Sequence, residues 1–436
     1  MNHQPDVVFP KPHPLRKELA NELHARPSVP LKPPAVVLRV ALATDETTSH
    51  DDRKFVEDLC HRFNAATPAL NSRWHAARLG DVFLRWERHT ELSTLTLHWA
   101  TEKDHERFAS KCPPGWPANW LEGAPGSLLS AVHMEIVGGP APTREVLAEQ
   151  FGEDLAVIGS PSAKFFAATT FRLDEDGYCP VAVWSDETHA DELGRKLQKL
   201  LEIETYRMAA LLSFPAAINA REAVSQIEAD IGEVMSELVD TTETTDDAHL
   251  LARVSELSAK AEAMQSRTSY RFAAGRAYHR LVKERLGSFD TASADEPREA
   301  MQTYSVFLAR RLEPAMRTCD AVEERLHALV KRIARATNLL ATRVDVRIGE
   351  QNAEVLKSLN QRTEAQLKLQ ETVEGLSVFA ISYYAVGLLS YLAKAAYQFG
   401  LPVKPEILTA AAVPLVMGLL WFGLNQLKAR FGKHLS

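Results

Sequence analysis

Cysteine is scarce in this sequence, and its few copies are far apart. The 436 residues contain only four cysteines, which are Cys60, Cys112, Cys179 and Cys319. They form no CxxC motif, and no histidine stands near them at the spacing of a metal ligand. This pattern excludes a disulfide-stabilised fold and a zinc site, and it favours free thiols in a reducing compartment.

An excess of positive charge and an N-terminal hydrophobic run are also missing. The net charge is −7, so the chain as a whole does not attract nucleic acid, and we predict no nucleic-acid partner. Residues 1–27 contain no long apolar segment of the kind that a secretory signal requires. We therefore expect the N-terminus to stay in the cytoplasm.

Motifs that would indicate catalysis are absent as well. The chain has no GxxxxGK[ST] phosphate loop, no GxGxxG, no HExxH and no GxSxG. We therefore predict no catalytic residue, no cofactor and no enzymatic activity, and the sequence names no metal ligand. A basic cluster near the start, HPLRKELANELHARP, offers Arg16, His24 and Arg26 as a candidate anion site. The alternative is a short surface helix whose leucines pack on the domain.

Two uncharged apolar runs near the end are the strongest feature that is present. The first covers residues 376–393 and the second 407–424, and each is about 18 residues long, near the lower limit for crossing a bilayer. Between them, residues 394–406 contain Pro402 and Pro405, which favour a turn. This pattern predicts a transmembrane hairpin in contact with the lipid bilayer. The alternative is a helical hairpin buried in a soluble core.

The distribution of Lys and Arg around the two runs predicts the orientation of the hairpin. Basic residues flank the hairpin on the two sides away from its loop, at Arg362, Lys368, Lys428, Arg430 and Lys433. The loop holds only Lys394 and Lys404. Under the positive-inside rule, this bias places both termini in the cytoplasm, together with a basic tail at residues 425–436.

Small and hydroxylated residues form a stripe along the first apolar run. Ser377, Tyr384 and Tyr391 recur every seven residues, with Ala380 and Gly387 between them, so a helix places all five on one face. Such a face meets another helix or water more readily than it meets lipid. The stripe therefore indicates either helix packing, within the hairpin or between protomers, or the wall of a pore.

Two acidic residues, Glu371 and Glu374, come just before the first apolar run. Around a symmetry axis they would form acidic rings at the cytoplasmic mouth of a pore, which would favour monovalent or divalent cations. In a single hairpin they would be solvated ends of the span. The sequence leaves both interpretations open.

A long helix is expected before the hairpin. Its apolar residues recur in steps of three or four, at Leu326, Leu329, Ile333, Ala336, Leu340, Val344 and Ile348. We predict a stalk helix over residues 297–375 that needs a neighbour along its length, because so long a helix is not stable alone. A homo-oligomer would supply that neighbour.

The first part of the chain has the pattern of a mixed domain. Residues 1–186 predict a cytoplasmic α+β domain with a mostly antiparallel sheet, and residues 187–296 predict a helical region with a break at SFPAA. The predicted strands are 35–43, 81–89, 92–100, 131–139, 164–173 and 180–185, and the predicted helices are 52–64 and 102–110. The fold class is therefore an α+β cytoplasmic domain followed by long α-helices and a C-terminal two-helix transmembrane hairpin.

Two segments resemble a known family of bacterial proteins. They are HPLRKELANELHARP near the start and TRVDVRIGEQNAEVLKSLNQRTEAQLKLQETVEGLSVFAISYYAVGLLSYL near the end. Both resemble predicted membrane-anchored proteins with domain of unknown function 3422, and the resemblance extends over almost the whole chain. It implies a multi-pass protein of the bacterial inner (plasma) membrane, and it implies no activity.

The order of the predicted elements also resembles that of CorA-type magnesium transporters. Members of that family are homopentamers in which a long helix continues from a cytoplasmic domain into the first span, and that span ends in a Gly-Met-Asn motif. The corresponding stretch here, LLSYLAKAAYQFG, lacks the motif, so no residue role is carried over. The resemblance implies a homo-oligomeric cation channel or transporter. The alternative is a membrane-anchored scaffold or sensor without transport activity.

Overall fold

The computed structural model describes most of the chain, and the chain divides into two compact units. The described residues are 11–16, 20, 28–45, 48, 51–102, 105–109, 111–152, 154–160, 163–240, 247–290, 301–399 and 402–432. The first unit is Met1–Thr245 with His249–Thr337, and the second is Asp246–Ala248 with Asn338–Ser436. The two units differ in how they bury their apolar residues.

A mixed β-sheet forms the centre of the first unit. Within the described residues it has nine strands in the order β2-β3-β4-β1-β5-β8-β7-β6-β9. β5 pairs in parallel with β8, and β6 with β9, whereas the other neighbours are antiparallel, as predicted. The strands are β1 (Ala35–Ala43), β2 (Trp74–Leu79), β3 (Val82–Arg88), β4 (Leu92–Ala100), β5 (Ser127–Gly138), β6 (Ala156–Ile158), β7 (Phe165–Thr169), β8 (Cys179–Ser185) and β9 (Gln302–Thr303).

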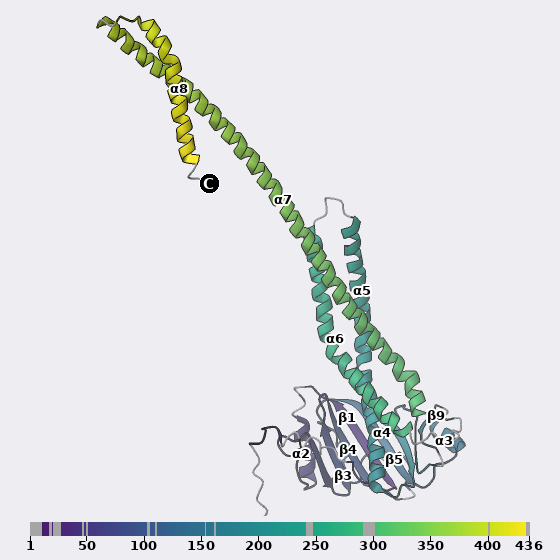
Figure 1. Cartoon of the computed structure of the whole chain (residues 1–436). Coiled ribbons are helices and arrows are strands. Elements are labelled where there is room, and N and C mark those ends of the chain that lie inside the picture. Colours follow the sequence, from purple (N-terminus) through teal and green to yellow (C-terminus); the bar gives the residue numbers. More distant parts are fainter. Residues whose placement is uncertain are drawn as a thin grey trace, which may run out of the picture. The chain divides into compact units, whose positions relative to one another are not determined.

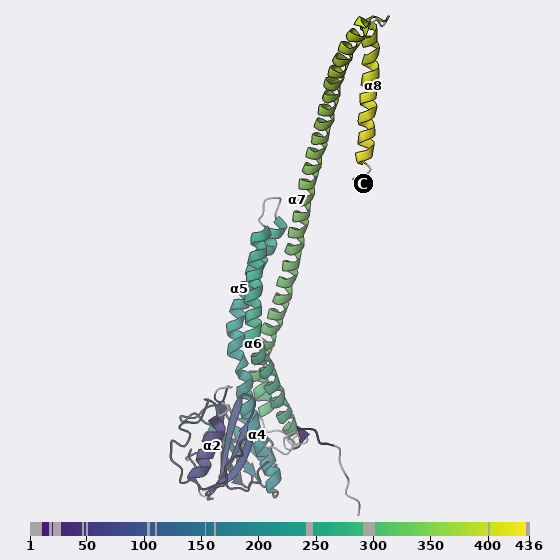
Figure 2. The same ribbon diagram turned by 90° about the vertical axis from the view of Figure 1, so that its left-hand side faces the viewer.

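Both faces of this sheet are buried, and β1 illustrates how. Val36 belongs to an apolar cluster with Trp86, on the side of helix α2 (Asp51–Arg62). Val37 belongs to a second cluster, with the apolar residues of helix α4 (Ala190–Leu211). Figure 2 shows α2 and α4 on opposite sides of the sheet. A strand covered on both faces needs apolar residues on both, which is why AVVLRVALA is almost continuously apolar. A short helix, α3 (Arg144–Phe151), follows β5.

Three long helices pack together in the first unit. Helices α5 (Ser213–Asp240), α6 (Asp247–Asp290) and the first part of α7 (Tyr304–Gln398) lie side by side in Figures 1 and 2. The predicted apolar stripe of α7 is buried here, from Leu326 to Ala336. At the edge of this contact, the guanidinium of Arg325 pairs with a carboxylate oxygen of Glu228 at 2.6 Å. The neighbour that this part of α7 needs is therefore supplied by the same chain.

The second unit consists mainly of α7 beyond residue 337 and of helix α8 (Pro405–Gly432). Every residue from 348 to 373 is exposed. The exposed residues include Leu356 and Leu359, whose exposed fractions are 62% and 51%. In a single chain, this part of the predicted stalk has no covering neighbour among the described residues.

Several boundaries differ from the predicted ones, and one predicted helix is wrong. Residues 105–109, inside the predicted helix 102–110, are not helical. Phe108 has a φ of +60°, and its N–H donates to the buried carboxylate of Glu135 at 3.1 Å, a contact that outweighs local helix propensity. Helix α7 begins at Tyr304 rather than at residue 297, and it continues beyond the predicted span to Gln398. The four cysteines form no disulfide, as predicted.

Candidate functional site

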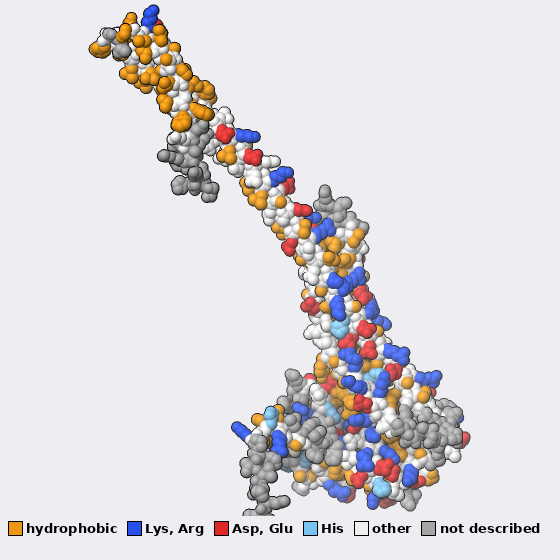
Figure 3. Space-filling view, in the orientation of Figure 1, with side chains coloured by type: hydrophobic (Ala, Val, Ile, Leu, Met, Phe, Trp, Pro, Cys, Tyr) orange, Lys and Arg blue, Asp and Glu red, His pale blue; other side chains and the backbone are white. Residues whose placement is uncertain are grey.

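Two helices of the second unit are long and apolar enough to cross a membrane. They are the last part of α7 and residues Pro405–Gly423 of α8. Only 6% of the apolar segment of α7 is buried, and 0% of that of α8, whereas a core helix of a soluble protein would be mostly buried. Figure 3 shows hydrophobic side chains gathered on this pair of helices. The burial pattern therefore gives no support to a hairpin inside a soluble core.

Ser382 marks the face of α7 that α8 covers. Its side chain is only 5% exposed, although its neighbours in the sequence are open to the surroundings. Together with Val413 and Met417 of α8, it lines a groove of about 600 Å³ between the two helices. The hydroxyl of Ser382 has no hydrogen-bond partner among the described residues. The contact between the two helices is therefore narrow and leaves most of α7 uncovered.

Helix α8 borders the predicted stripe but leaves most of it exposed. Tyr384 and Tyr391 are 71% and 74% exposed, and Ser377 and Ala380 are exposed as well. Gly387 is half-buried and reaches the groove, together with the two tyrosines. The hydroxyl of Ser377 donates to the carbonyl four residues earlier at 2.9 Å, so its own helix satisfies it. The stripe therefore borders the groove to α8 but stays mostly exposed, so packing within the hairpin, packing between protomers and a wet pathway all remain predictions.

One chain does not complete the acidic candidate site, and most of the basic one lies outside the described residues. Glu371 is exposed, and Glu374 accepts a hydrogen bond from Nε2 of Gln370 at 3.2 Å. These two carboxylates belong to a single helix, so a ring would require further copies of the chain. Arg16 is exposed, whereas His24 and Arg26 of the candidate anion cluster lie outside the described residues.

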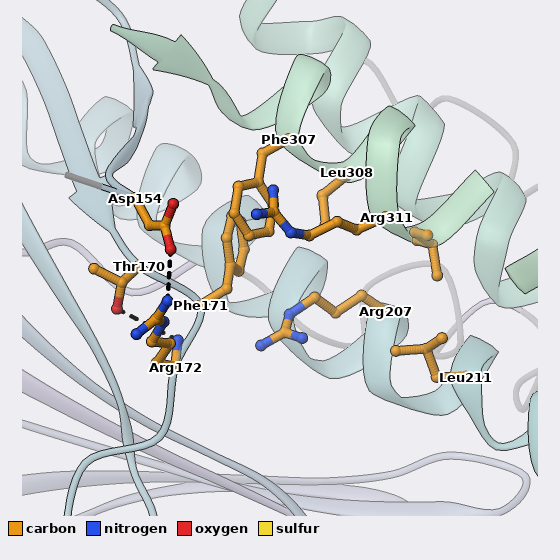
Figure 4. A pocket seen from close by; sticks show the side chains of 10 residues that line it. Asp154, Thr170, Phe171, Arg172, Arg207, Leu211, Phe307, Leu308 and Arg311 are labelled. Carbon is orange, nitrogen blue, oxygen red and sulfur yellow. Dashed lines mark hydrogen bonds and ion pairs between the residues drawn. The ribbon is translucent and has the colours of Figure 1, made fainter. Parts of the chain in front are cut away.

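A pocket in the first unit gathers three arginines that the sequence pattern did not single out. Arg172 comes from the loop after β7, Arg207 from α4 and Arg311 from α7. Figure 4 shows their side chains around one cavity. The three positions are far apart in the sequence, so no local motif predicts the pocket. The only hint in the sequence is the pair of adjacent arginines, Arg310 and Arg311, of which Arg311 lines the pocket.

The side of the sheet that faces α4 also holds buried charges. Arg39, Arg85 and Glu87 are at most 6% exposed, and Nη2 of Arg85 lies 2.7 Å from Oε1 of Glu87. Burial alone would raise the pKa of Glu87, but the two arginines hold it below its usual value. Burial and the charge of Arg78 lower the pKa of His98 to about 4. The cavity beside these residues is only about 40 Å³, too small for a ligand, so the cluster is not a candidate binding site.

These features define a class of protein with an α/β sheet domain, a bundle of long helices and two helices that could cross a membrane. The family model that matches is described as Protein of unknown function (DUF3422), and it matches residues 11–431. The chain belongs to this family, which confirms the resemblance seen in its sequence. No curated protein and no solved structure matches the chain. The likeness to CorA-type transporters therefore stays a prediction, and function has to be argued from the sites.

Proposed function

We propose that the protein is a homo-oligomer of the bacterial inner membrane, anchored by the hairpin of α7 and α8, with the sheet domain and both termini in the cytoplasm. The observation that carries this proposal is the exposed segment 348–373 of α7, which includes Val355, Leu356 and Leu359. Apolar side chains spaced three or four residues apart on a lone helix are stabilised by a second helix. Four negative and three positive residues are interspersed along the same segment, so copies can face one another with little net repulsion.

The stripe of Ser377, Tyr384 and Tyr391 supports a cation pathway as the activity of this assembly. Because most of this face is exposed, a ring of copies could turn it toward a common axis. Hydroxyl groups can replace part of the hydration of a cation, and Glu371 and Glu374 would add negative charge at the cytoplasmic mouth. This arrangement is the one that the likeness to CorA-type transporters implies.

A membrane-anchored scaffold or sensor without transport is the second candidate, and one observation favours it. Lys394 follows the stripe by three residues, and its Nζ lies 5.9 Å from the centroid of the Tyr391 ring. A ring of lysines at the outer end of a pathway would repel cations. The Gly-Met-Asn motif is also missing from this part of the sequence.

The mass of the purified protein in detergent tests the assembly. We expect light scattering, after subtraction of the detergent, to give a multiple of the mass of one chain. A monomer at every protein concentration would contradict the homo-oligomer.

Ion flux into liposomes separates the two candidates. We expect passage of Mg²⁺, Co²⁺ or K⁺, and we expect Tyr384→Leu to reduce it by about tenfold, which corresponds to about 1.4 kcal/mol in a barrier. Tyr397→Leu is the matched control, because Tyr397 is also exposed, does not line the groove and lies about 120° or more around the helix from Tyr384 and Tyr391. If none of the three ions passed, the proposal of a cation pathway would be contradicted and the scaffold or sensor would be favoured.

A further inference from the structure

The arginine pocket lies where three elements of the first unit meet. Its walls come from Thr170, Phe171 and Arg172 after β7, from Arg207 and Leu211 of α4, and from the start of α7. The cavity has a volume of about 290 Å³, near the lower limit of pockets that hold small molecules. All of its walls belong to the first unit, so the pocket is independent of the proposed membrane function.

Arg207 is held in place by a buried carboxylate. Its Nε and Nη2 donate to Glu204, with a shortest distance of 2.7 Å, and the side chain of Glu204 is only 2% exposed. Burial would lower the pKa of Arg207, but the pairing with Glu204 raises it, so the guanidinium stays charged. Its Nη1 lies 3.6 Å from Sδ of Met208, which is a weak acceptor. An oxyanion in the pocket would be a stronger acceptor for this group.

Arg311 has no ion-pair partner among the described residues. Its guanidinium carbon lies 4.1 Å from the centroid of the Phe307 ring, and that ring stacks on Phe171 at 4.6 Å. Arg207 lies over the ring of Phe171 at 5.0 Å. The stacked rings thus position two guanidinium groups by cation–π contact. An arginine stacked on a ring keeps its in-plane N–H groups for hydrogen bonds with a ligand.

Arg172 stands at the open side of the pocket. Its Nη2 donates to Asp154 at 2.5 Å, but the two side chains are 75% and 53% exposed, so the pair is solvated and weak. An anionic ligand can therefore compete with Asp154 at little cost. The neighbouring residue, Phe171, has a φ of +57°, a left-handed conformation that is uncommon outside glycine and that recurs at ligand sites.

We propose that this pocket binds a small organic phosphate. Three guanidinium groups line or enter it against two carboxylates, Glu204 and Asp154, which leaves an excess of one positive charge. A phosphate monoester offers three oxygen atoms to donors on different sides, whereas a carboxylate offers two, which suit a single arginine. The apolar side chains of Leu211, Leu308 and Leu312 form the remaining wall, against which the organic part of the ligand packs. The bound phosphate would join Arg311 of α7 to the arginines of α4 and the β7 loop.

Titration calorimetry on the purified full-length protein in detergent tests the site, with phenyl phosphate as the probe. We expect binding that Arg311→Gln weakens by about tenfold or more, because one charge-assisted contact is lost. Arg310→Gln is the matched control, since Arg310 is the exposed neighbour that does not line the pocket, and it should leave the affinity unchanged. Both substitutions lie on the surface, and equal melting temperatures would show that the fold is intact. Absence of binding, or equal losses in the two variants, would overturn the site.

Three further probes test the class of ligand. Benzoate and benzyl alcohol carry a similar ring without phosphate, and inorganic phosphate lacks the ring, so each should bind about tenfold more weakly than phenyl phosphate. Equal affinity for benzoate would overturn the preference for phosphate. Equal affinity for benzyl alcohol would overturn anion recognition, and equal affinity for inorganic phosphate would overturn the role of the leucines.

Discussion

The same helix is a core element in one unit of this chain and an uncovered one in the other. In the first unit, apolar clusters cover both faces of the sheet, and the stripe of α7 from Leu326 to Ala336 is buried. In the second unit, every residue from 348 to 373 is exposed, and the apolar segments that follow are almost entirely uncovered. The contrast shows that the first unit buries its apolar clusters within one chain. We infer that the second unit is completed by its surroundings, with lipid around the hairpin and further copies along residues 348–373.

The largest effect of a single substitution on the free energy of unfolding is expected in the first unit. Trp86 is fully buried, and its indole N–H donates to Oγ of Ser93 at 2.9 Å. Trp86→Ala removes the contacts of a large ring and leaves a cavity, so we expect the free energy of unfolding to fall by about 3–5 kcal/mol. Urea unfolding followed by circular dichroism measures this loss. Trp421→Ala is the control in α8, where the ring is 64% exposed, and equal losses in both variants would remove the distinction between the units.

An effect of intermediate size is a pH dependence that belongs to the first unit. In the folded chain, burial and the charge of Arg78 lower the pKa of His98 from its usual 6.5 to about 4. Between these values the unfolded chain binds a proton that the folded chain does not bind. The free energy of unfolding therefore falls as the pH falls from 6.5 toward 4, by at most about 1.4 kcal/mol per pH unit.

His98→Asn isolates this contribution, because it removes the titrating ring. Urea midpoints at several pH values between 6.5 and 4.5 should show a shallower slope for the variant than for the parent chain. The lowered pKa of Glu87 acts in a separate window, since its contribution is lost only as the pH falls below its usual value of 4.5. An unchanged slope in the variant would show that another group carries the proton uptake.

Strands with a clear apolar pattern were predictable from the sequence, and short ones were not. The predicted runs 35–43, 81–89, 92–100 and 180–185 match β1, β3, β4 and β8 within one residue at each end. The strands β2, β6 and β9 have no such pattern, because neighbouring strands rather than their own side chains decide that they are extended. The predicted break at SFPAA is too long. Helix α5 begins at Ser213 and holds Pro215 in its first turn, where a proline is tolerated.

The stripe on α7 and the arginine pocket also differ in how far the sequence could predict them. The stripe of Ser377, Tyr384 and Tyr391 was predictable because a seven-residue spacing fixes one face of a helix by local geometry alone. That Ser382 is buried while the two tyrosines of the stripe stay mostly exposed depends on how two helices pack, which the spacing does not determine. The arginine pocket depends on packing entirely, since Arg172 and Arg311 meet only where a loop, α4 and α7 converge.

The smallest effect on unfolding is expected at the exposed leucines, Leu356 and Leu359. Truncating both to alanine removes little intrachain contact, so the free energy of unfolding of the first unit should change by less than about 0.5 kcal/mol. In the proposed homo-oligomer the same side chains lie between copies, and the double variant should shift the mass in detergent toward the monomer. Lys357→Ala is the matched control, because Lys357 lies between the leucines in the sequence but about 100° around the helix from Leu356. If the double variant kept the full mass, the exposed face of α7 would not be the contact between copies, and some other partner would have to cover it.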